Sequence, residues 1–126
     1  MRVLKLVPVL ALAVFSHLAL ALDLVPYTPA EFAKLQQEGK PVALHFHADW
    51  CPTCRAQTKV FDKFKAAGEL PMTILVVDYD TEKALERKLG VRTQSTLIIY
   101  DGKMETDRIV GITDPMALRE ALQSAL

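Results

Sequence analysis

The spacing of apolar residues along the chain changes between two periods, which predicts that strands and helices alternate. Three short runs are apolar at almost every position, as expected for strands that are buried on both faces of a sheet. Elsewhere apolar residues recur every three or four positions, as they do on the buried side of a helix. The expected strands are 42–47, 72–78 and 96–100, and the expected helices are 29–39, 55–67, 82–89 and a last one that starts at Asp114-Pro115.

Turn and capping residues separate these elements. Thr28-Pro29-Ala30-Glu31 has the form of a capping box with proline at the first helical position, and Thr81 is the expected cap of the third helix. Asp101-Gly102 is a hairpin signal, so the strand after it, 105–110, is expected to return antiparallel. With a short strand at Leu24-Val25, the order is β-α-β-α-β-α-β-β-α, which predicts an α/β fold with a central mixed β-sheet and helices on both faces.

The first residues have the pattern of an export signal. Arg2 and Lys5 form a positively charged start, and 6–18 is a mostly apolar run. Ala19-Leu20-Ala21 has the small-x-small form of a cleavage site. We therefore expect a signal peptide that is cleaved after Ala21.

Cleavage at this point divides the chain into a signal peptide, 1–21, and one domain, 22–126, in an extracytoplasmic compartment, either periplasmic or secreted. The alternative is an uncleaved N-terminal membrane anchor, but the apolar run is short for a span and contains Ser16 and His17. The whole chain has 15 basic and 15 acidic residues, and loss of the two basic residues in the signal leaves 13 against 15, a net charge of −2. Because the basic residues are interspersed with acids, the sequence does not support nucleic-acid binding.

The chain has two cysteines, Cys51 and Cys54, and they lie where the strand 42–47 ends and a helix begins. A Cys-x-x-Cys pair at such a junction indicates a redox-active dithiol. Cys51 is expected at the helix N-terminus, where free N–H groups and the helix dipole stabilise a thiolate, and Cys54 lies one turn further on the same face. A structural disulfide is one alternative, although so short a loop would stabilise the fold little, and half of a zinc site is another.

Two separated stretches resemble the thioredoxin family, and the resemblance covers essentially all of 22–126. The first is Phe46-His47-Ala48-Asp49-Trp50-Cys51-Pro52-Thr53-Cys54, and the second is Leu89-Gly90-Val91-Arg92-Thr93-Gln94-Ser95-Thr96-Leu97-Ile98-Ile99-Tyr100, followed by the glycine step Val110-Gly111. The resemblance implies a thioredoxin fold in which Cys51 attacks a substrate disulfide and Cys54 resolves the mixed disulfide. It also implies a substrate-binding surface, whose expected members are Trp50, Pro52, Thr53, Gln94 and Ser95.

Three features depart from the family pattern, and two of them lie around the thiols. Pro52-Thr53 stands between the cysteines where reductases often have Gly-Pro, which leaves the reduction potential open. Ser95 takes the place of a cis-proline opposite the cysteines, so we expect a trans Gln94–Ser95 bond, because a non-proline cis bond costs roughly 2.5–4 kcal/mol. The smaller side chain is expected to reshape the loop and to leave room beside the thiols for a metal or a second thiol; the alternative is a tolerated substitution that only shifts the loop.

The third departure is His45, which stands where reductases carry a buried carboxylate. His45 and His47 alternate with apolar residues, so both side chains are expected on the same face of the sheet. His45 is either a neutral, hydrogen-bonded core residue or a catalytic group that accepts the proton of Cys54. His47 lies nearer the motif and is expected at the rim of the site.

These observations predict an extracytoplasmic thiol–disulfide oxidoreductase that acts on protein or small-molecule disulfides without a cofactor. The chain is too short for the inserted helical domain of the family's periplasmic oxidases, which favours a reductase that receives electrons from a membrane-bound thiol donor. A monomer is expected. The alternative function is metal binding or delivery, because Cys51, Cys54 and a nearby histidine offer soft ligands for Cu(I) or zinc.

Overall fold

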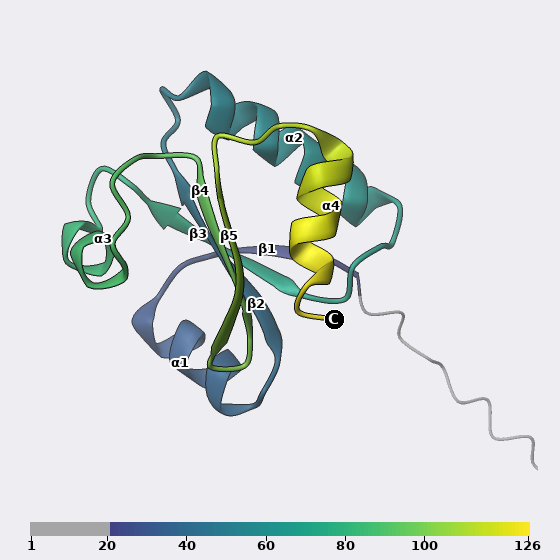
Figure 1. Cartoon of the computed structure of the whole chain (residues 1–126), viewed down its shortest axis with the longest axis horizontal. Coiled ribbons are helices and arrows are strands. Elements are labelled where there is room, and N and C mark those ends of the chain that lie inside the picture. The colour runs from purple at the N-terminus through teal and green to yellow at the C-terminus, as the bar shows by residue number, and fades with distance from the viewer. Residues whose placement is uncertain (1–20) are drawn as a thin grey trace, which may run out of the picture.

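Five strands form a mixed sheet at the centre of the fold (Figure 1). They are β1 (Asp23–Pro26), β2 (Pro41–His47), β3 (Thr73–Asp78), β4 (Thr96–Asp101) and β5 (Met104–Val110). Their order across the sheet is β1-β3-β2-β4-β5. β3 is parallel to both of its neighbours, whereas β4 is antiparallel to β2 and to β5. The mixed sheet predicted from the sequence is confirmed.

The computed structural model describes residues 21–126. The signal peptide predicted for 1–21 therefore lies outside the described residues, apart from its last position. Within the described range, no helix combines the length and the apolar character that crossing a bilayer requires.

Four helices cover the two faces of the sheet, as the sequence predicted. They are α1 (Pro29–Gln37), α2 (Pro52–Ala66), α3 (Lys83–Leu89) and α4 (Pro115–Gln123). Phe61 of α2 and Leu122 of α4 share one apolar core with Ala43, whereas Leu35 of α1 belongs to a second core with Phe46. Alternate residues of β2 thus enter opposite cores, because successive side chains of a strand point to opposite faces. The ribbon shows the same division, with α2 and α4 on one side and α1 and α3 on the other (Figure 1).

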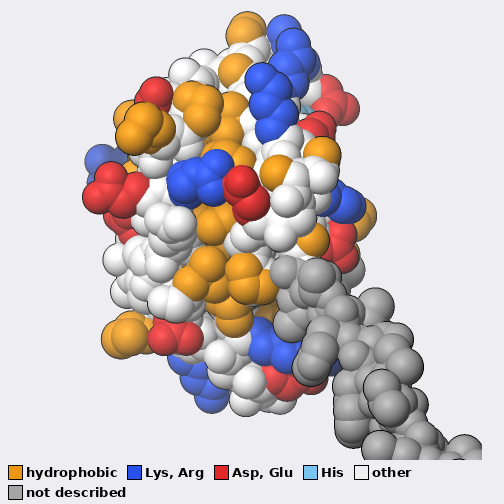
Figure 2. Space-filling view, turned by 90° about the vertical axis from the view of Figure 1, so that its right-hand side faces the viewer, with side chains coloured by type: hydrophobic (Ala, Val, Ile, Leu, Met, Phe, Trp, Pro, Cys, Tyr) orange, Lys and Arg blue, Asp and Glu red, His pale blue; other side chains and the backbone are white. Residues whose placement is uncertain are grey.

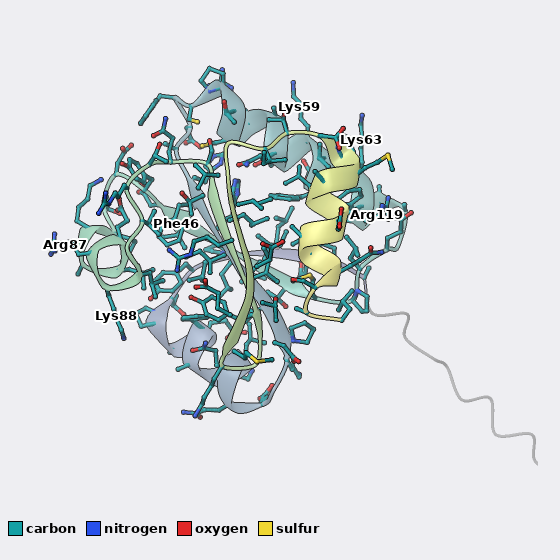
Figure 3. The ribbon with its side chains drawn as sticks, in the orientation of Figure 1. Phe46, Lys59, Lys63, Arg87, Lys88 and Arg119 are labelled. Atoms are coloured by element: carbon teal, nitrogen blue, oxygen red, sulfur yellow. The ribbon has the colours of Figure 1, made fainter. Side chains whose placement is uncertain are left out.

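Figure 3 shows which side chains lie inside the fold and which project outward. Phe46 lies inside the molecule, whereas Lys59 and Lys63 project outward from α2. On the face turned toward the viewer in Figure 2, lysine and arginine side chains are interspersed with acidic ones around patches of apolar surface. Arg119 of α4, labelled in Figure 3, pairs with Glu69.

The predicted helix starts are confirmed at α1 and α4, but the start of α3 was wrong. Thr28 accepts a hydrogen bond from the backbone of Glu31, as expected of a capping box. Thr81 was expected to cap α3, but the helix begins at Lys83 without a side-chain cap. The reason is that the chain first turns back on Asp78, whose carbonyl accepts from Thr81 and from the next residue.

Candidate active site

The two cysteines lie at the carboxyl end of the central strand, where β2 leads into α2. Cys51 is the N-cap residue of α2, and its Sγ accepts a hydrogen bond from the backbone N–H of Cys54 at 3.1 Å. Pro52 occupies the first turn of the helix, where its missing N–H leaves no gap in the hydrogen bonding. Both cysteines are free thiols, and Cys51 is 2% exposed whereas Cys54 is fully buried.

The surroundings separate the pKa values of the two thiols. Burial raises the pKa of Cys51, but hydrogen bonds from the Cys54 thiol, the Ser95 hydroxyl and the first backbone N–H groups of α2 outweigh burial, and the pKa is lowered. Burial also raises the pKa of Cys54, and the hydrogen bond that its thiol makes to Cys51 raises it further. Because a thiolate is the nucleophile in disulfide exchange, the lowered pKa makes Cys51 the thiol that ionises more readily, whereas Cys54 keeps its proton.

Ser95 lies directly against the dithiol. Its Oγ is 3.2 Å from the Sγ of Cys51 and 3.1 Å from the Sγ of Cys54. No cis peptide bond occurs among residues 21–126, so the Gln94–Ser95 bond is trans as predicted. The loop is reshaped in another way, because Ser95 has a φ of +66°, a value that residues with a side chain rarely adopt. The serine hydroxyl therefore lies beside both thiols.

His45 is a buried, neutral member of a hydrogen-bonded pair with Gln57. Its Nε2 lies 2.8 Å from Oε1 of Gln57. Gln57 uses its amide N–H groups to donate to the carbonyls of Ser95 and Ile112, at 3.2 and 2.9 Å. Its Oε1 is therefore the acceptor, so His45 carries its proton on Nε2. Among the described residues, the hydrogen bond of His45 goes to Gln57 and not to either cysteine.

Burial determines the charge of His45. It lowers the pKa of His45 to about 4, against a smaller raising effect from the hydrogen bond with Gln57. The ring is therefore uncharged at neutral pH, and its Nδ1 has no hydrogen-bond partner in the described part of the chain. His47 lies on the same face, 5.4 Å away between ring centroids, as predicted. Its Nε2 is 3.0 Å from Asp49, at the rim of the site.

Gln57 is a site residue that the sequence analysis missed. It is fully buried on α2, one turn beyond Cys54, and it joins α2 to the segments that carry Ser95 and Ile112. A signal was present, because Gln57 is a polar residue on the buried stripe of a helix otherwise occupied by Cys54, Val60, Phe61 and Phe64. A buried polar group at such a position needs hydrogen-bond partners from elsewhere in the fold.

The remaining predicted site residues surround the cysteines. Trp50 is 57% exposed, and its indole N–H donates to Asp80 at 2.8 Å. A hollow of about 320 Å³ lies beside Trp50, between the β2–α2 loop and the end of β3. Pro52 is exposed, and Thr53 and Gln94 are half-buried. These side chains leave a partly apolar surface next to the thiols.

The structure offers few ligands for the alternative function of metal binding. Among residues 21–126, no group of three or more histidine, cysteine, aspartate or glutamate side chains is placed to hold a metal ion. Cys51 and Cys54 are thus a pair without a third ligand of this kind. His47 is the histidine nearest to the cysteines in the sequence, and its ring is paired with Asp49.

Comparisons with known proteins agree with this geometry. The family model described as Thioredoxin matches residues 23–124. A thioredoxin from Coprinus comatus is 32% identical over 97 residues, which cover 76% of this chain and 91% of that protein. The protein disulfide-isomerase erp38 of Neurospora crassa is 35% identical over 87 residues, 67% of this chain and 23% of that protein. The crystal structure of Trxlp from Edwardsiella tarda EIB202 has a TM-score of 0.72 and 35% identity, covering 81% of this chain and 98% of that one.

The buried His45 predicts a pH-dependent stability. Its pKa is about 4 in the folded protein and about 6.5 in the unfolded chain, so between these values the unfolded chain binds more protons. The contribution of the neutral His45 to the free energy of unfolding is therefore complete above pH 6.5. It falls as the pH falls toward 4, by up to about 3 kcal/mol. Urea unfolding at pH 7 and pH 4 should show this loss in the wild type and not in His45→Leu.

The matched control for this measurement is His47→Gln. It removes a histidine on the same face of the sheet but leaves His45 buried, so the loss between pH 7 and pH 4 should remain. An equal pH dependence in wild type and His45→Leu would show that His45 is not the group responsible.

Proposed function

Because the chain belongs to the thioredoxin family and carries the Cys51–Cys54 pair of a thiol–disulfide oxidoreductase, we propose that it is an extracytoplasmic enzyme that reduces disulfides with its Cys-Pro-Thr-Cys dithiol. The observation that carries this proposal is the division of labour between the thiols. Cys51 has a lowered pKa and lies at the helix N-terminus, whereas Cys54 has a raised pKa and is fully buried. A dithiol with one ready nucleophile and one protonated partner suits disulfide exchange.

The reaction has two steps. The Cys51 thiolate attacks one sulfur of the substrate disulfide, which forms a mixed disulfide and releases the other substrate sulfur as a thiolate. Cys54 then loses its proton and attacks Cys51, which closes the Cys51–Cys54 disulfide and releases the second substrate thiolate. The substrate gains two electrons, and the dithiol loses two. The second step is intramolecular and therefore fast, because the two thiols are held one helical turn apart.

The reductive direction is supported by the architecture. The described residues form the sheet and helices of a minimal thioredoxin domain, without the inserted helical domain that the family's periplasmic oxidases carry. The Coprinus comatus relative, of which this chain covers 91%, is a thioredoxin by name. The relative named a protein disulfide-isomerase matches over only 23% of its own length, so it is a weaker guide to direction.

We propose that the substrate is a protein or small-molecule disulfide that docks on the surface around the thiols. Trp50 offers an exposed aromatic face beside Cys51, and its indole is oriented by Asp80. Pro52 and Thr53 extend the surface along the first turn of α2. The backbone of Gln94 lies on the opposite side and is suited to pair with an extended substrate, as in strand addition.

The extracytoplasmic location is supported by where the domain begins. Leu22 follows the expected cleavage position directly, and it is 1% exposed and part of the apolar core next to α2 and α4. Its N–H donates to the carbonyl of Glu69 at 3.0 Å. Cleavage after Ala21 would therefore leave every buried residue of the described domain in the mature protein.

Trapping variants test the roles of the two cysteines. Cys54→Ser removes the resolving thiol, so a mixed disulfide with a substrate protein should accumulate on Cys51 and be visible by intact mass. Cys51→Ser removes the nucleophile and should form no such adduct, although Cys54 remains. An adduct of similar yield on Cys54 in the second variant would contradict the assignment.

The direction of the reaction is tested by the reduction potential. Equilibration of the purified domain with glutathione buffers should give a value nearer the about −270 mV of thioredoxin than the about −120 mV of a strong oxidant. The reduced and oxidised forms can be counted by the mass added on alkylation of the free thiols. A value near the oxidising end would reverse the proposed direction and leave the dithiol chemistry in place.

Export is tested by expressing the full chain in a Gram-negative bacterium and separating its compartments. The protein should be found in the periplasm, and its mass should be that of a chain that begins at Leu22. Ala21→Leu enlarges the residue at the cleavage site and should leave an uncleaved, heavier chain. Recovery of the wild type as the uncleaved chain in the membrane fraction would favour the N-terminal anchor instead.

A further inference from the structure

The hydroxyl of Ser95 lies within hydrogen-bond distance of both reactive sulfurs. Its Oγ is 3.2 Å from Cys51 Sγ and 3.1 Å from Cys54 Sγ. Apart from the two cysteines themselves, no other side chain of residues 21–126 makes a hydrogen bond to either sulfur. A hydroxyl carries one hydrogen and two lone pairs, so it can donate to one sulfur while it accepts from the other.

The fold holds this hydroxyl in place against a conformational cost. Ser95 has a φ of +66°, which a side chain disfavours. Three hydrogen bonds maintain the backbone there. The N–H of Ser95 donates to Phe46 O at 2.8 Å, and its carbonyl accepts from Gly111 N at 3.0 Å and from Gln57 Nε2 at 3.2 Å. Backbone strain that is held by several contacts is concentrated at functional sites.

We propose that Ser95 is a catalytic residue whose hydroxyl donates a hydrogen bond to whichever cysteine sulfur carries the negative charge, first to Cys51 in the dithiol and then to Cys54 in the mixed disulfide. This inference rests on the dithiol chemistry proposed above. In this proposal the Ser95 hydroxyl stabilises the Cys51 thiolate and then the Cys54 thiolate. His45, the other candidate for assisting Cys54, makes its hydrogen bond to Gln57 instead.

In the resting dithiol, Ser95 donates its O–H to the Cys51 thiolate, and Cys54 lies beside it as a protonated thiol. When Cys51 attacks a disulfide, its sulfur becomes part of a neutral disulfide and no longer attracts the hydroxyl hydrogen. The Cys54 proton then passes to water, and the hydroxyl turns its hydrogen to the Cys54 thiolate. Formation of the Cys51–Cys54 bond breaks the bond to the substrate sulfur, which leaves as a thiolate. Over both steps two thiolates and one proton are released, and two electrons pass to the substrate.

The contact with the Ser95 hydroxyl affects the pKa of both thiols. A hydrogen bond from a hydroxyl favours the charged form of a sulfur, and the Ser95 hydroxyl lowers the pKa of Cys51 and of Cys54 alike, within the larger effects of burial. A proline at this position has no donor, so the reactivity of these sulfurs would differ from that of a site with proline. Loss of the hydroxyl should therefore slow both chemical steps, not only the first.

The test follows both steps in one reaction with 5,5′-dithiobis(2-nitrobenzoate). The first coloured thiolate is released when Cys51 attacks the reagent, and the second when Cys54 resolves the mixed disulfide. Stopped-flow traces of the reduced domain across pH then report each step separately. The variants are Ser95→Ala, which removes only the oxygen, and Ser95→Gly, which also removes the conformational cost of a positive φ.

In both variants the pH midpoint of the first phase should rise by about one unit, since a hydrogen bond to a charged group is worth about tenfold in equilibrium. At a pH below the midpoints each phase should slow about threefold, because the tenfold loss of thiolate is partly offset by the greater nucleophilicity of a more basic sulfur. The matched control is Thr96→Val. It removes the neighbouring hydroxyl, which donates to Thr93 O and does not contact the sulfurs, so both phases should keep the wild-type midpoints and rates.

Agreement between Ser95→Gly and Ser95→Ala would assign the effect to the hydroxyl, because the two variants differ in backbone strain but not in the missing donor. Wild-type rates in both phases, or slowing of the first phase alone, would overturn the proposal. These results differ from failure of the proposed function, in which the wild type itself would release no second thiolate.

Discussion

The central strand β2 has neither a free edge nor a free face, and the position of the active site depends on this constraint. β3 and β4 pair with its two edges, and the residues at 42–46 are completely buried. Pairing at both edges and burial of both faces therefore fix the carboxyl end of β2, where the chain turns into α2. The register with β4 places Phe46 opposite Thr96, so Ser95 reaches the same end of the sheet as the cysteines. The reactive thiols thus lie where a buried strand leads into a helix, the kind of element that positions side chains more precisely than a loop does.

The polar groups under the site form an uncharged network. His45 is fully buried beneath the site, and burial keeps its ring neutral. Its partner Gln57 reaches across to the carbonyls of Ser95 and Ile112, so one side chain joins α2, the segment before β4 and the segment after β5. A neutral network adds no buried charge that would oppose the Cys51 thiolate. It also satisfies polar groups that would otherwise be costly to bury.

The cysteines and Ser95 connect this network to the chemistry. The first backbone N–H groups of α2 and the Ser95 hydroxyl converge on Cys51, while the full burial of Cys54 keeps its proton in place. The positive φ of Ser95 is the local cost of bringing its side chain to the sulfurs, and three hydrogen bonds offset it. Trp50 remains exposed beside this buried centre, so the surface available to a substrate and the groups that tune the thiols are separate parts of the site.

The sequence by itself determined the features that depend on neighbours along the chain. Hydrophobic periods, caps and the Cys-x-x-Cys junction were enough to predict the order of strands and helices, the mixed sheet and the place of Cys51 at a helix N-terminus. Only the tertiary structure decided which side chains meet across the fold. Ser95 contacts Cys51, which is 44 positions away in the sequence, and Gln57 reaches Ile112, which is 55 positions away. The first turn of α3 is displaced by backbone hydrogen bonds to Asp78. Such contacts follow from strand register and helix packing, which local patterns do not specify, because a hydrogen bond depends on distance in space and not on separation along the chain.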